Sequence, residues 1–120
     1  MTKSNFDFKK NNSFSKRKNN CDSILQKYPD RLPVIVEKDK SASSLNNIDK
    51  NKFLVPYEIT LGQFLHIIRQ RCKLDASQSL YLFCGNILPP TSQTIGNIYQ
   101  EQKDEDGFLY ITYCSENTFG

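Results

Sequence analysis

Three segments decide the fold: RLPVIVEK (31–38), KFLV (52–55) and TLGQFLHIIRQRC (60–72). The first is rich in β-branched side chains and alternates its residues between two faces, which predicts a strand. The second is a short apolar run that ends at Pro56, a residue that disfavours continuation of regular structure. Because a polar loop joins the two runs, we predict a β-hairpin with a long connection, followed by a helix.

The third segment carries both a start signal and a buried face for that helix. Thr60 and Gln63 have the T-x-x-Q form of a capping box, in which the two side chains satisfy free N–H groups of the first turn. One apolar stripe follows at helical spacing: Leu61, Phe64, Leu65, Ile68 and Cys72. Basic residues close the segment, where positive charge suits the C-terminal end of the helix dipole.

The rest of the chain adds a helix before this unit and further elements after it. We predict a short helix over residues 22–28, which Pro29 ends. Its inward-facing residues are expected to be Ile24, Leu25 and Tyr28. The predicted elements after the long helix are a strand (80–84), a short helix capped by Thr94 and a last strand (108–113).

This order, a helix followed by β-β-α-β-α-β, predicts an α+β fold with one mixed four-stranded sheet and the long helix across one face. That is the ubiquitin-like β-grasp arrangement. We divide the chain into a basic N-terminal arm or first helix (1–19), a ubiquitin-like domain with its preceding helix (20–116) and a flexible tail (117–120). The length of 120 residues, of which 38% are hydrophobic and 24% charged, suits one small globular domain.

Cysteine and histidine usage disfavours a metal site and nucleophilic catalysis. The four cysteines, at positions 21, 72, 84 and 114, have neither CxxC spacing nor that of a zinc site, and we predict reduced, mostly buried thiols. The one histidine, His66, falls within the predicted long helix, where we expect a structural role. We therefore predict no catalytic residues, no metal and no cofactor. A cysteine-dependent enzyme is kept as a third hypothesis, which would need a reactive thiolate near His66.

Positive charge is concentrated at the N-terminus. Residues 1–20 carry six basic side chains and one acidic one, whereas the other hundred residues carry ten basic and twelve acidic ones. Such an arm suits an anionic membrane or an acidic protein, and the alternative is a solvated, partly disordered terminus. No recognition-helix or aromatic-platform pattern supports nucleic acid as the partner. Since neither a spanning apolar run nor a secretory signal is recognisable, we expect a soluble, cytosolic protein.

Longer stretches of the chain form a pattern of their own. They are KYPDRLPVIVEK (27–38), DKNKFLVP (49–56), TLGQFLHIIRQR (60–71), LPPTS (88–92), DEDGFLYITY (104–113) and the ending ENTFG (116–120). In this order and spacing they resemble the autophagy ubiquitin-like modifiers, the relatives of yeast's autophagy modifier, of microtubule-associated-protein light chain three and of the GABA-receptor-associated protein. The resemblance runs from Lys16 onward and implies a β-grasp body with two additional N-terminal helices.

In that family the C-terminal glycine is activated by an enzyme of the ubiquitin-activating type, passed to a conjugating enzyme and joined to phosphatidylethanolamine. Gly120 is the matching residue, and Phe119 and Gly120 match the ending that these enzymes and a processing and delipidating cysteine protease recognise. A terminal glycine suits a narrow active-site channel because it has no Cβ. The resemblance thus implies a modifier, not an enzyme, on autophagosome membranes and other cytoplasmic vesicles, with the vacuole or lysosome lumen as a further destination. Whether residues follow Gly120 in a precursor stays open.

The resemblance also implies a groove beside the second strand that binds aromatic-x-x-aliphatic motifs of cargo receptors and autophagy proteins as an added strand. The positions that match the aromatic pocket are Ile24, Pro33, Ile35, Lys52, Leu54 and Phe108. Those that match the aliphatic pocket are Phe53, Val55, Pro56, Ile59, Phe64 and Ile67. A basic rim of Lys50, Lys52 and Arg71 would suit acidic residues that flank the motif. For Ile59 and Ile67, a core position and a pocket position are both open.

Two residues depart from the family pattern. Asn20 stands where relatives often have an acidic residue beside the aromatic pocket, which predicts a different motif preference. Gly107 stands where many relatives have a bulkier residue. The alternative function is an unconjugated interaction scaffold, in vesicle trafficking or on microtubules, which would use the groove and the basic arm but not Gly120.

Overall fold

The computed structural model describes residues 6–42, 45–75 and 77–115, and in this part of the chain four strands form one sheet in the order β2-β1-β4-β3. The strands are β1 (Arg31–Lys38), β2 (Lys52–Pro56), β3 (Tyr81–Phe83) and β4 (Leu109–Cys114). The helices are α1 (Asp7–Asn11), α2 (Phe14–Lys27), α3 (Leu61–Cys72) and α4 (Ile95–Gln102). The central strands β1 and β4 run parallel, and each pairs antiparallel with its outer neighbour. The mixed four-stranded sheet is therefore confirmed.

Local sequence signals account for most of these boundaries. The predicted hairpin is formed by β1 and β2. The capping box at the start of α3 is present, because Thr60 Oγ1 accepts from the N–H of Gln63 at 3.1 Å and the Gln63 side chain accepts from the N–H of Thr60 at 2.9 Å. Thr94 caps α4 in the predicted place. These elements formed where short-range patterns predicted them.

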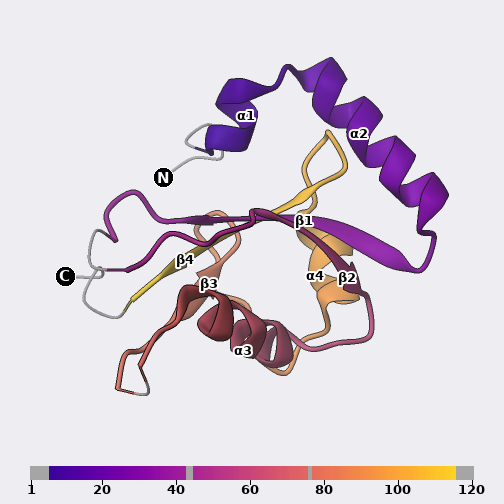
Figure 1. The fold of residues 1–120 in the computed structure, drawn as a ribbon. Coiled ribbons are helices and arrows are strands. Elements are labelled where there is room, and N and C mark those ends of the chain that lie inside the picture. The colour runs from indigo at the N-terminus through magenta and orange to yellow at the C-terminus, as the bar shows by residue number, and fades with distance from the viewer. Residues whose placement is uncertain (1–5, 43–44, 76, 116–120) are drawn as a thin grey trace.

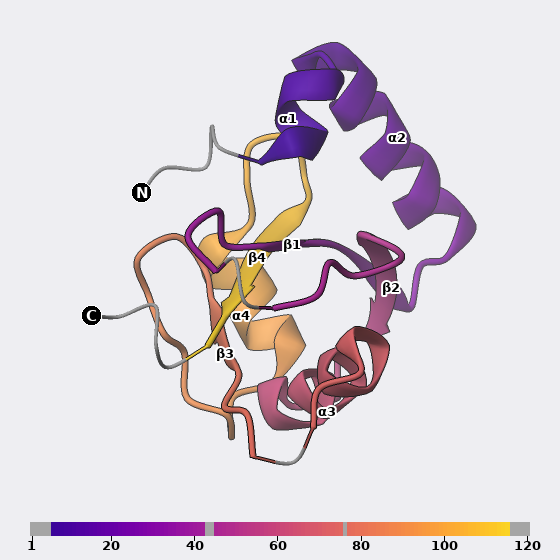
Figure 2. The ribbon, with the colours of Figure 1, turned by 60° about the vertical axis from the view of Figure 1, so that its left-hand side comes forward.

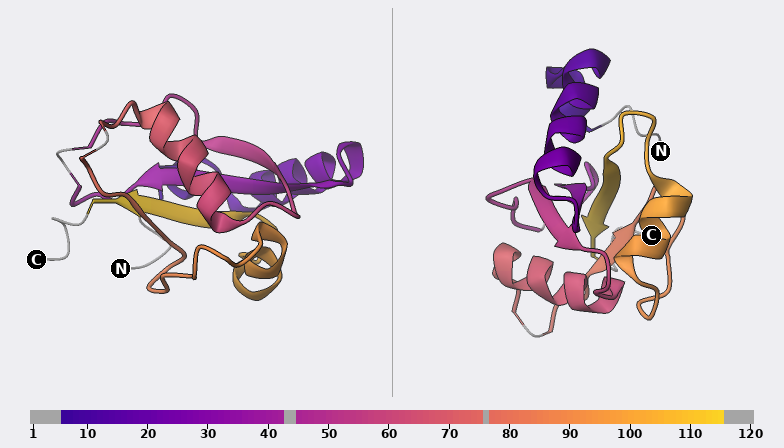
Figure 3. Two further views of the ribbon diagram at one scale, coloured as in Figure 1. Left: turned by 90° about the horizontal axis from the view of Figure 1, so that it is seen from below. Right: turned by 90° about the vertical axis from the view of Figure 1, so that its right-hand side faces the viewer.

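The sheet lies between two layers of helices (Figure 1). α3 and α4 cover one face, and α1 and α2 lie over the other, which the turned views of Figures 2 and 3 show from other sides. The side chains of β1 alternate between the two faces as predicted. Val34 and Val36 are fully buried on the side of α3 and α4, and Ile35 is fully buried on the side of α2. Both faces of the central strands are therefore covered.

Two apolar clusters result from this layering. The larger, which we call the main core, lies between the sheet and the helices α3 and α4, and it includes Val34, Phe64, Ile68, Ile98 and Tyr113. The smaller, which we call the α2 cluster, consists of Phe6, Cys21, Ile24, Ile35, Phe108 and Tyr110. Phe8, Leu25 and Leu54 are partly buried against the α2 cluster.

α2 is longer than the short helix that we predicted over residues 22–28. It begins at Phe14, after Ser13, whose side chain accepts a hydrogen bond from the N–H of Lys16, and it ends at Lys27. The first half of α2 was missed because it contains the polar run KRKNN (16–20), in which the one buried residue is Arg17 and not an aliphatic residue. Tyr28 is 41% exposed and forms the C-cap, so the prediction that it faces inward was wrong.

The positive charge of the N-terminal arm is directed inward at two places. Lys9 Nζ lies 2.7 Å from Asp104 Oδ1, and Arg17 Nε lies 2.9 Å from Asp106 Oδ2, so both cations pair with the acidic loop between α4 and β4. Because Phe6, just before α1, and Arg17 in α2 are buried, the described part of the arm is folded structure and not a solvated tail. The division of the chain at residues 19 and 116 stays a prediction.

All four cysteines are buried and unbridged, as predicted. Within the described ranges, no group of three or more His, Cys, Asp and Glu side chains is placed to hold a metal ion. In the same ranges, every helix is too short or too polar to cross a membrane. Phe119 and Gly120, with the rest of the predicted tail, lie outside the described residues.

Candidate functional site

β2 is an edge strand: in the described sheet it pairs with β1 along one edge, and no other strand of that sheet lies along its outer edge. The outer edge of such a strand presents backbone N–H and C=O groups to which another strand can pair. Phe53 and Val55 belong to the main core, whereas Lys52 and Leu54 lie on the α2 side of the sheet. The β2 positions assigned to the two pockets therefore lie on opposite faces of one edge strand, because successive side chains of a strand point to opposite sides.

Most residues assigned to the aromatic pocket lie together in the α2 cluster. Ile24 from α2, Ile35 from β1 and Phe108, just before β4, are buried members of this cluster, and Leu54 packs against it. Pro33 is buried two residues before Ile35, on the same side of β1. Ile35 and Phe108 are fully buried, but Leu54 is only partly covered, so this cluster reaches the surface at the β2 edge.

Lys52 joins that edge to α2. Its Nζ donates a hydrogen bond to Asn20 Oδ1 at 2.7 Å and lies 5.6 Å from the centroid of the Phe8 ring. Burial lowers the pKa of the Lys52 ammonium. Asn20 thus offers an oxygen to this cation although it carries no charge, and the tether between α2 and β2 has one charged partner instead of two.

Phe8, which the sequence reasoning missed, reaches the same place from α1. Its ring meets the Phe108 ring edge-on, with 5.2 Å between the centroids. Glu37 in β1 holds the helix there, because its carboxylate accepts the N–H of Asp7 at 2.8 Å and that of Phe8 at 3.0 Å. A helix of five residues is too short to show an apolar period, and its capping residue is 30 positions away, so no local signal marked Phe8.

The residues assigned to the aliphatic pocket do not share one environment. Phe53, Val55 and Phe64 are buried in the main core, and the partly buried Ile59 packs against it. The neighbouring Pro56 is half-buried. Ile67 is 37% exposed, so it lies at the surface of α3 and not in the core.

The predicted basic rim lies on both sides of β2. Lys50 Nζ and Arg71 Cζ lie 5.9 Å and 5.6 Å from the centroid of the Phe53 ring, on the face opposite Lys52. Arg71 also pairs with Asp49 at 3.4 Å. Both of these side chains are exposed, and an exposed pair of this kind contributes roughly 0–1 kcal/mol, so a partner's carboxylate could replace Asp49 at small cost.

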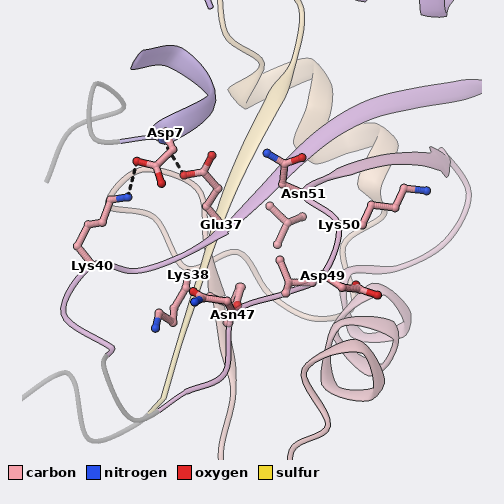
Figure 4. A pocket seen from close by; sticks show the side chains of 11 residues that line it. Asp7, Glu37, Lys38, Lys40, Asn47, Asp49, Lys50 and Asn51 are labelled. Carbon is pink, nitrogen blue, oxygen red and sulfur yellow. Dashed lines mark hydrogen bonds and ion pairs between the residues drawn. The ribbon is translucent and has the colours of Figure 1, made fainter. Parts of the chain in front are cut away.

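A separate pocket of about 490 Å³ lies between the start of α1, the end of β1 and the loop before β2 (Figure 4). Its lining carries three lysines and three carboxylates: Lys38, Lys40, Lys50, Asp7, Glu37 and Asp49. Lys40 pairs with Asp7 at 2.9 Å, and this hydrogen bond lowers the pKa of Asp7. Since its positive and negative side chains are equal in number, the net charge of the lining favours neither an anion nor a cation.

The buried thiols of Cys21 and Cys72 have the wrong character for catalysis. A nucleophilic cysteine needs a lowered pKa, but burial raises the pKa of Cys21 to about 11 and also raises the pKa of Cys72. His66 lies exposed on α3. This is the reverse of what the hypothesis of a cysteine-dependent enzyme requires.

Comparison with known proteins identifies the family of this chain. A family model described as "Autophagy protein Atg8 ubiquitin like" matches residues 16–120. The chain belongs to the Atg8 family. Autophagy-related protein 8e of Arabidopsis thaliana is 54% identical over 113 residues, which cover 94% of this chain and 92% of that protein. Autophagy-related protein 8 of Aspergillus niger is 51% identical, with 94% and 95% covered.

A solved structure of the Atg8 family has the same fold. The crystal structure of Trypanosoma brucei ATG8 is similar with a TM-score of 0.90 and 37% sequence identity, and the match covers 97% of this chain and 99% of that one. The predicted family and the ubiquitin-like fold are thereby confirmed. The chain is an autophagy ubiquitin-like protein of the Atg8 family.

Proposed function

We propose that this Atg8-family chain is a modifier that is joined through Gly120 to phosphatidylethanolamine on autophagosomal membranes. There it recruits cargo receptors and autophagy proteins that carry aromatic-x-x-aliphatic motifs. The observation that carries the proposal is the family match, which extends through residue 120. Its enzyme partners are an activating enzyme, a conjugating enzyme and a delipidating cysteine protease. The chain itself acts as substrate and adaptor, in the cytoplasm and on autophagosomes and other vesicles, and it reaches the vacuole or lysosome lumen with them.

Lipid attachment would explain how a chain with no spanning helix in its described residues becomes membrane-bound. The amine of the lipid attacks the activated carbonyl of Gly120, so that an amide bond forms as the thioester to the conjugating enzyme breaks and its thiol leaves. Two acyl chains then anchor the protein, since each buried CH₂ contributes about 0.8 kcal/mol and a single chain holds only marginally. Phe119 and Gly120 are the residues that the activating and conjugating enzymes would recognise.

Motif binding is supported by the geometry of β2. An added strand would pair with its outer edge, while the aromatic side chain of the motif enters at the α2 cluster beside Leu54 and Lys52. The aliphatic side chain would lie on the opposite face, beside Ile59 and Ile67. Lys50, Lys52 and Arg71 would meet the acidic residues that flank the motif.

The conjugation half of the proposal is tested by intact mass. The membrane-bound protein is isolated from its own cells and compared with a Gly120→Ala variant, and Thr118→Ala is the matched control in the same tail. We expect a mass increment equal to phosphatidylethanolamine in the unaltered chain and in Thr118→Ala, but not in Gly120→Ala. An unmodified mass in the membrane fraction would refute conjugation and would favour the unconjugated scaffold.

The motif-binding half is tested with a peptide that has acidic residues before a Trp-x-x-Leu motif. The chain contains no tryptophan, so the fluorescence of the peptide's own tryptophan reports binding directly. We expect Leu54→Ala, at the partly covered edge of the α2 cluster, to weaken binding. Leu88→Ala is the control, because Leu88 is 50% exposed outside the sheet. Equal binding by both variants would contradict the assigned pocket.

A further inference from the structure

We propose that Asp106 is a positioning residue for the aromatic pocket: it fixes the distance between α2, which carries Ile24, and Phe108, although it lines no part of the pocket itself. This inference rests on the proposed motif-binding function. In the loop between α4 and β4, the side chain of Asp106 is fully buried. A fully buried carboxylate is uncommon and is retained only where it is well paired.

Asp106 joins three parts of the fold through one carboxylate. Its Oδ2 accepts from Arg17 Nε at 2.9 Å and from the Tyr110 hydroxyl at 2.5 Å, and its Oδ1 accepts from the backbone N–H of Phe108 at 2.8 Å. α2, β4 and the backbone of the pocket residue Phe108 are thus held by the same group. A shift of this carboxylate would therefore move α2, which carries Ile24, relative to Phe108 on the other side of the pocket.

The side of α2 that meets this loop also supplies the pocket. Its buried residues are Arg17, Cys21 and Ile24, which lie at i, i+4 and i+7 and therefore on one face of the helix. Arg17 is tied to Asp106, and Ile24 enters the α2 cluster two turns later. Because a helix is stiff over two turns, fixing Arg17 also fixes the height of Ile24 above the sheet.

The loop is itself held in place, so it is a firm anchor for α2. The Tyr99 hydroxyl of α4 donates to the carbonyl oxygen of Gly107 at 2.5 Å, and Lys9 of α1 pairs with Asp104 at 2.7 Å. In the same loop, Gly107 lies so close to α2 that a Cβ atom at position 107 would come within 2.4 Å of Cys21 Sγ. The anchor therefore leaves α2 little freedom to approach or to slide.

A buried ion pair suits positioning better than it suits stability. Removing two charges from water offsets most of the attraction between them, and apolar residues of the same size often stabilise a protein as well or better. Apolar contacts alone, however, tolerate sliding, whereas the hydrogen bond from Arg17 Nε to Asp106 Oδ2 is directional. We therefore expect the loss of this pair to change pocket geometry more than its effect on stability alone would indicate.

The test is a double-mutant cycle between protein variants and three peptides. Binding is measured by NMR titration, which gives dissociation constants into the millimolar range. The peptides carry acidic residues before Trp-x-x-Leu, Ala-x-x-Leu or Trp-x-x-Ala. The protein variants are Asp106→Asn and, as the matched control, Glu105→Gln, because Glu105 is the exposed acidic neighbour in the same loop. We expect Asp106→Asn to weaken both Trp-containing peptides about tenfold and to leave Ala-x-x-Leu within about twofold of the unaltered chain. Glu105→Gln should match the unaltered chain with every peptide.

A loss by the same factor for all three peptides would overturn the inference, because Asp106 would then act through general stability. So would unchanged binding in Asp106→Asn. If Asp106→Asn does not fold, the comparison is made with Arg17→Met/Asp106→Asn, which leaves no unpaired guanidinium inside and keeps an oxygen for the N–H of Phe108. An unaltered chain that binds none of the peptides would refute the proposed motif binding instead, and the inference with it.

Discussion

Replacing Gly107 by alanine should destabilise the protein for two separable reasons. Its φ angle is +96°, in the left-handed region, where a side chain adds roughly 1–2 kcal/mol of strain. A Cβ at this position would also lie 2.4 Å from Cys21 Sγ, far inside van der Waals contact. Overpacking of this kind typically adds about 1–3 kcal/mol, so we expect Gly107→Ala to lower the free energy of unfolding by about 2–5 kcal/mol.

Gly85 offers a matched control for the strain alone. Its φ angle is +60°, but a Cβ there would meet nothing within 4 Å. Gly85→Ala should therefore lower the free energy of unfolding by about 1–2 kcal/mol. The difference between the two alanine variants isolates the contact with Cys21.

The assay is urea unfolding followed by circular dichroism, for both alanine variants, for Cys21→Gly and for Cys21→Gly/Gly107→Ala. Without Sγ at position 21 the clash disappears, so the double variant should be more stable than the sum of the single effects by about 1–3 kcal/mol. Zero coupling between positions 21 and 107 would refute the reasoning. So would a Gly107→Ala variant no less stable than Gly85→Ala.

Two further predictions concern alkaline pH and α1. Burial raises the pKa of Cys21 from 9.0 to about 11, so between these pH values the unfolded chain binds fewer protons than the folded one, and the free energy of unfolding falls by up to about 1.4 kcal/mol per pH unit. Urea midpoints measured at pH 8, 9 and 10 should therefore fall less steeply in Cys21→Ala than in the unaltered chain, and equal slopes would contradict the raised pKa. Glu37→Ala removes the carboxylate that accepts hydrogen bonds from the N–H groups of Asp7 and Phe8, and the loss of such a cap costs about 1 kcal/mol. Hydrogen exchange of the α1 amides should become several-fold faster, while exchange of the α3 amides stays unchanged. Unchanged exchange in α1 would show that Phe6 and Phe8 hold this helix without the cap.

The elements that the sequence predicted are those whose determinants lie close together in the chain. α3 has its capping box and its apolar stripe within thirteen residues, from Thr60 to Cys72, and β1 shows its alternation within eight. For such elements the tertiary structure only had to agree with local preference. The family resemblance then added what periodicity does not contain: the assignment of β2 residues to two pockets and of Gly120 to conjugation.

The first half of α2 shows the opposite case. By composition, KRKNN is typical of a solvated segment, and its one buried side chain, Arg17, is a residue that is almost never fully buried unless paired. Its partner Asp106 is 89 positions away, in a loop whose own sequence reads as acidic surface. Each charge alone predicts solvent exposure, and only their pairing predicts burial. Phe8 was missed for the same reason, since Glu37 lies in another element.

Asn20 and Gly107, which the sequence analysis set apart, both make contacts between α2 and the rest of the fold. Asn20 accepts a hydrogen bond from the ammonium of Lys52 at 2.7 Å, so α2 and β2 are linked with less electrostatic attraction than a carboxylate at position 20 would give. Gly107 is small because Cys21 fills the space above it, so a bulkier residue at position 107 requires a smaller one at position 21. Both residues lie where α2 meets the body of the fold. Because α2 also carries Ile24, a change in the fit of this helix would alter the aromatic pocket even where every residue that lines it is retained.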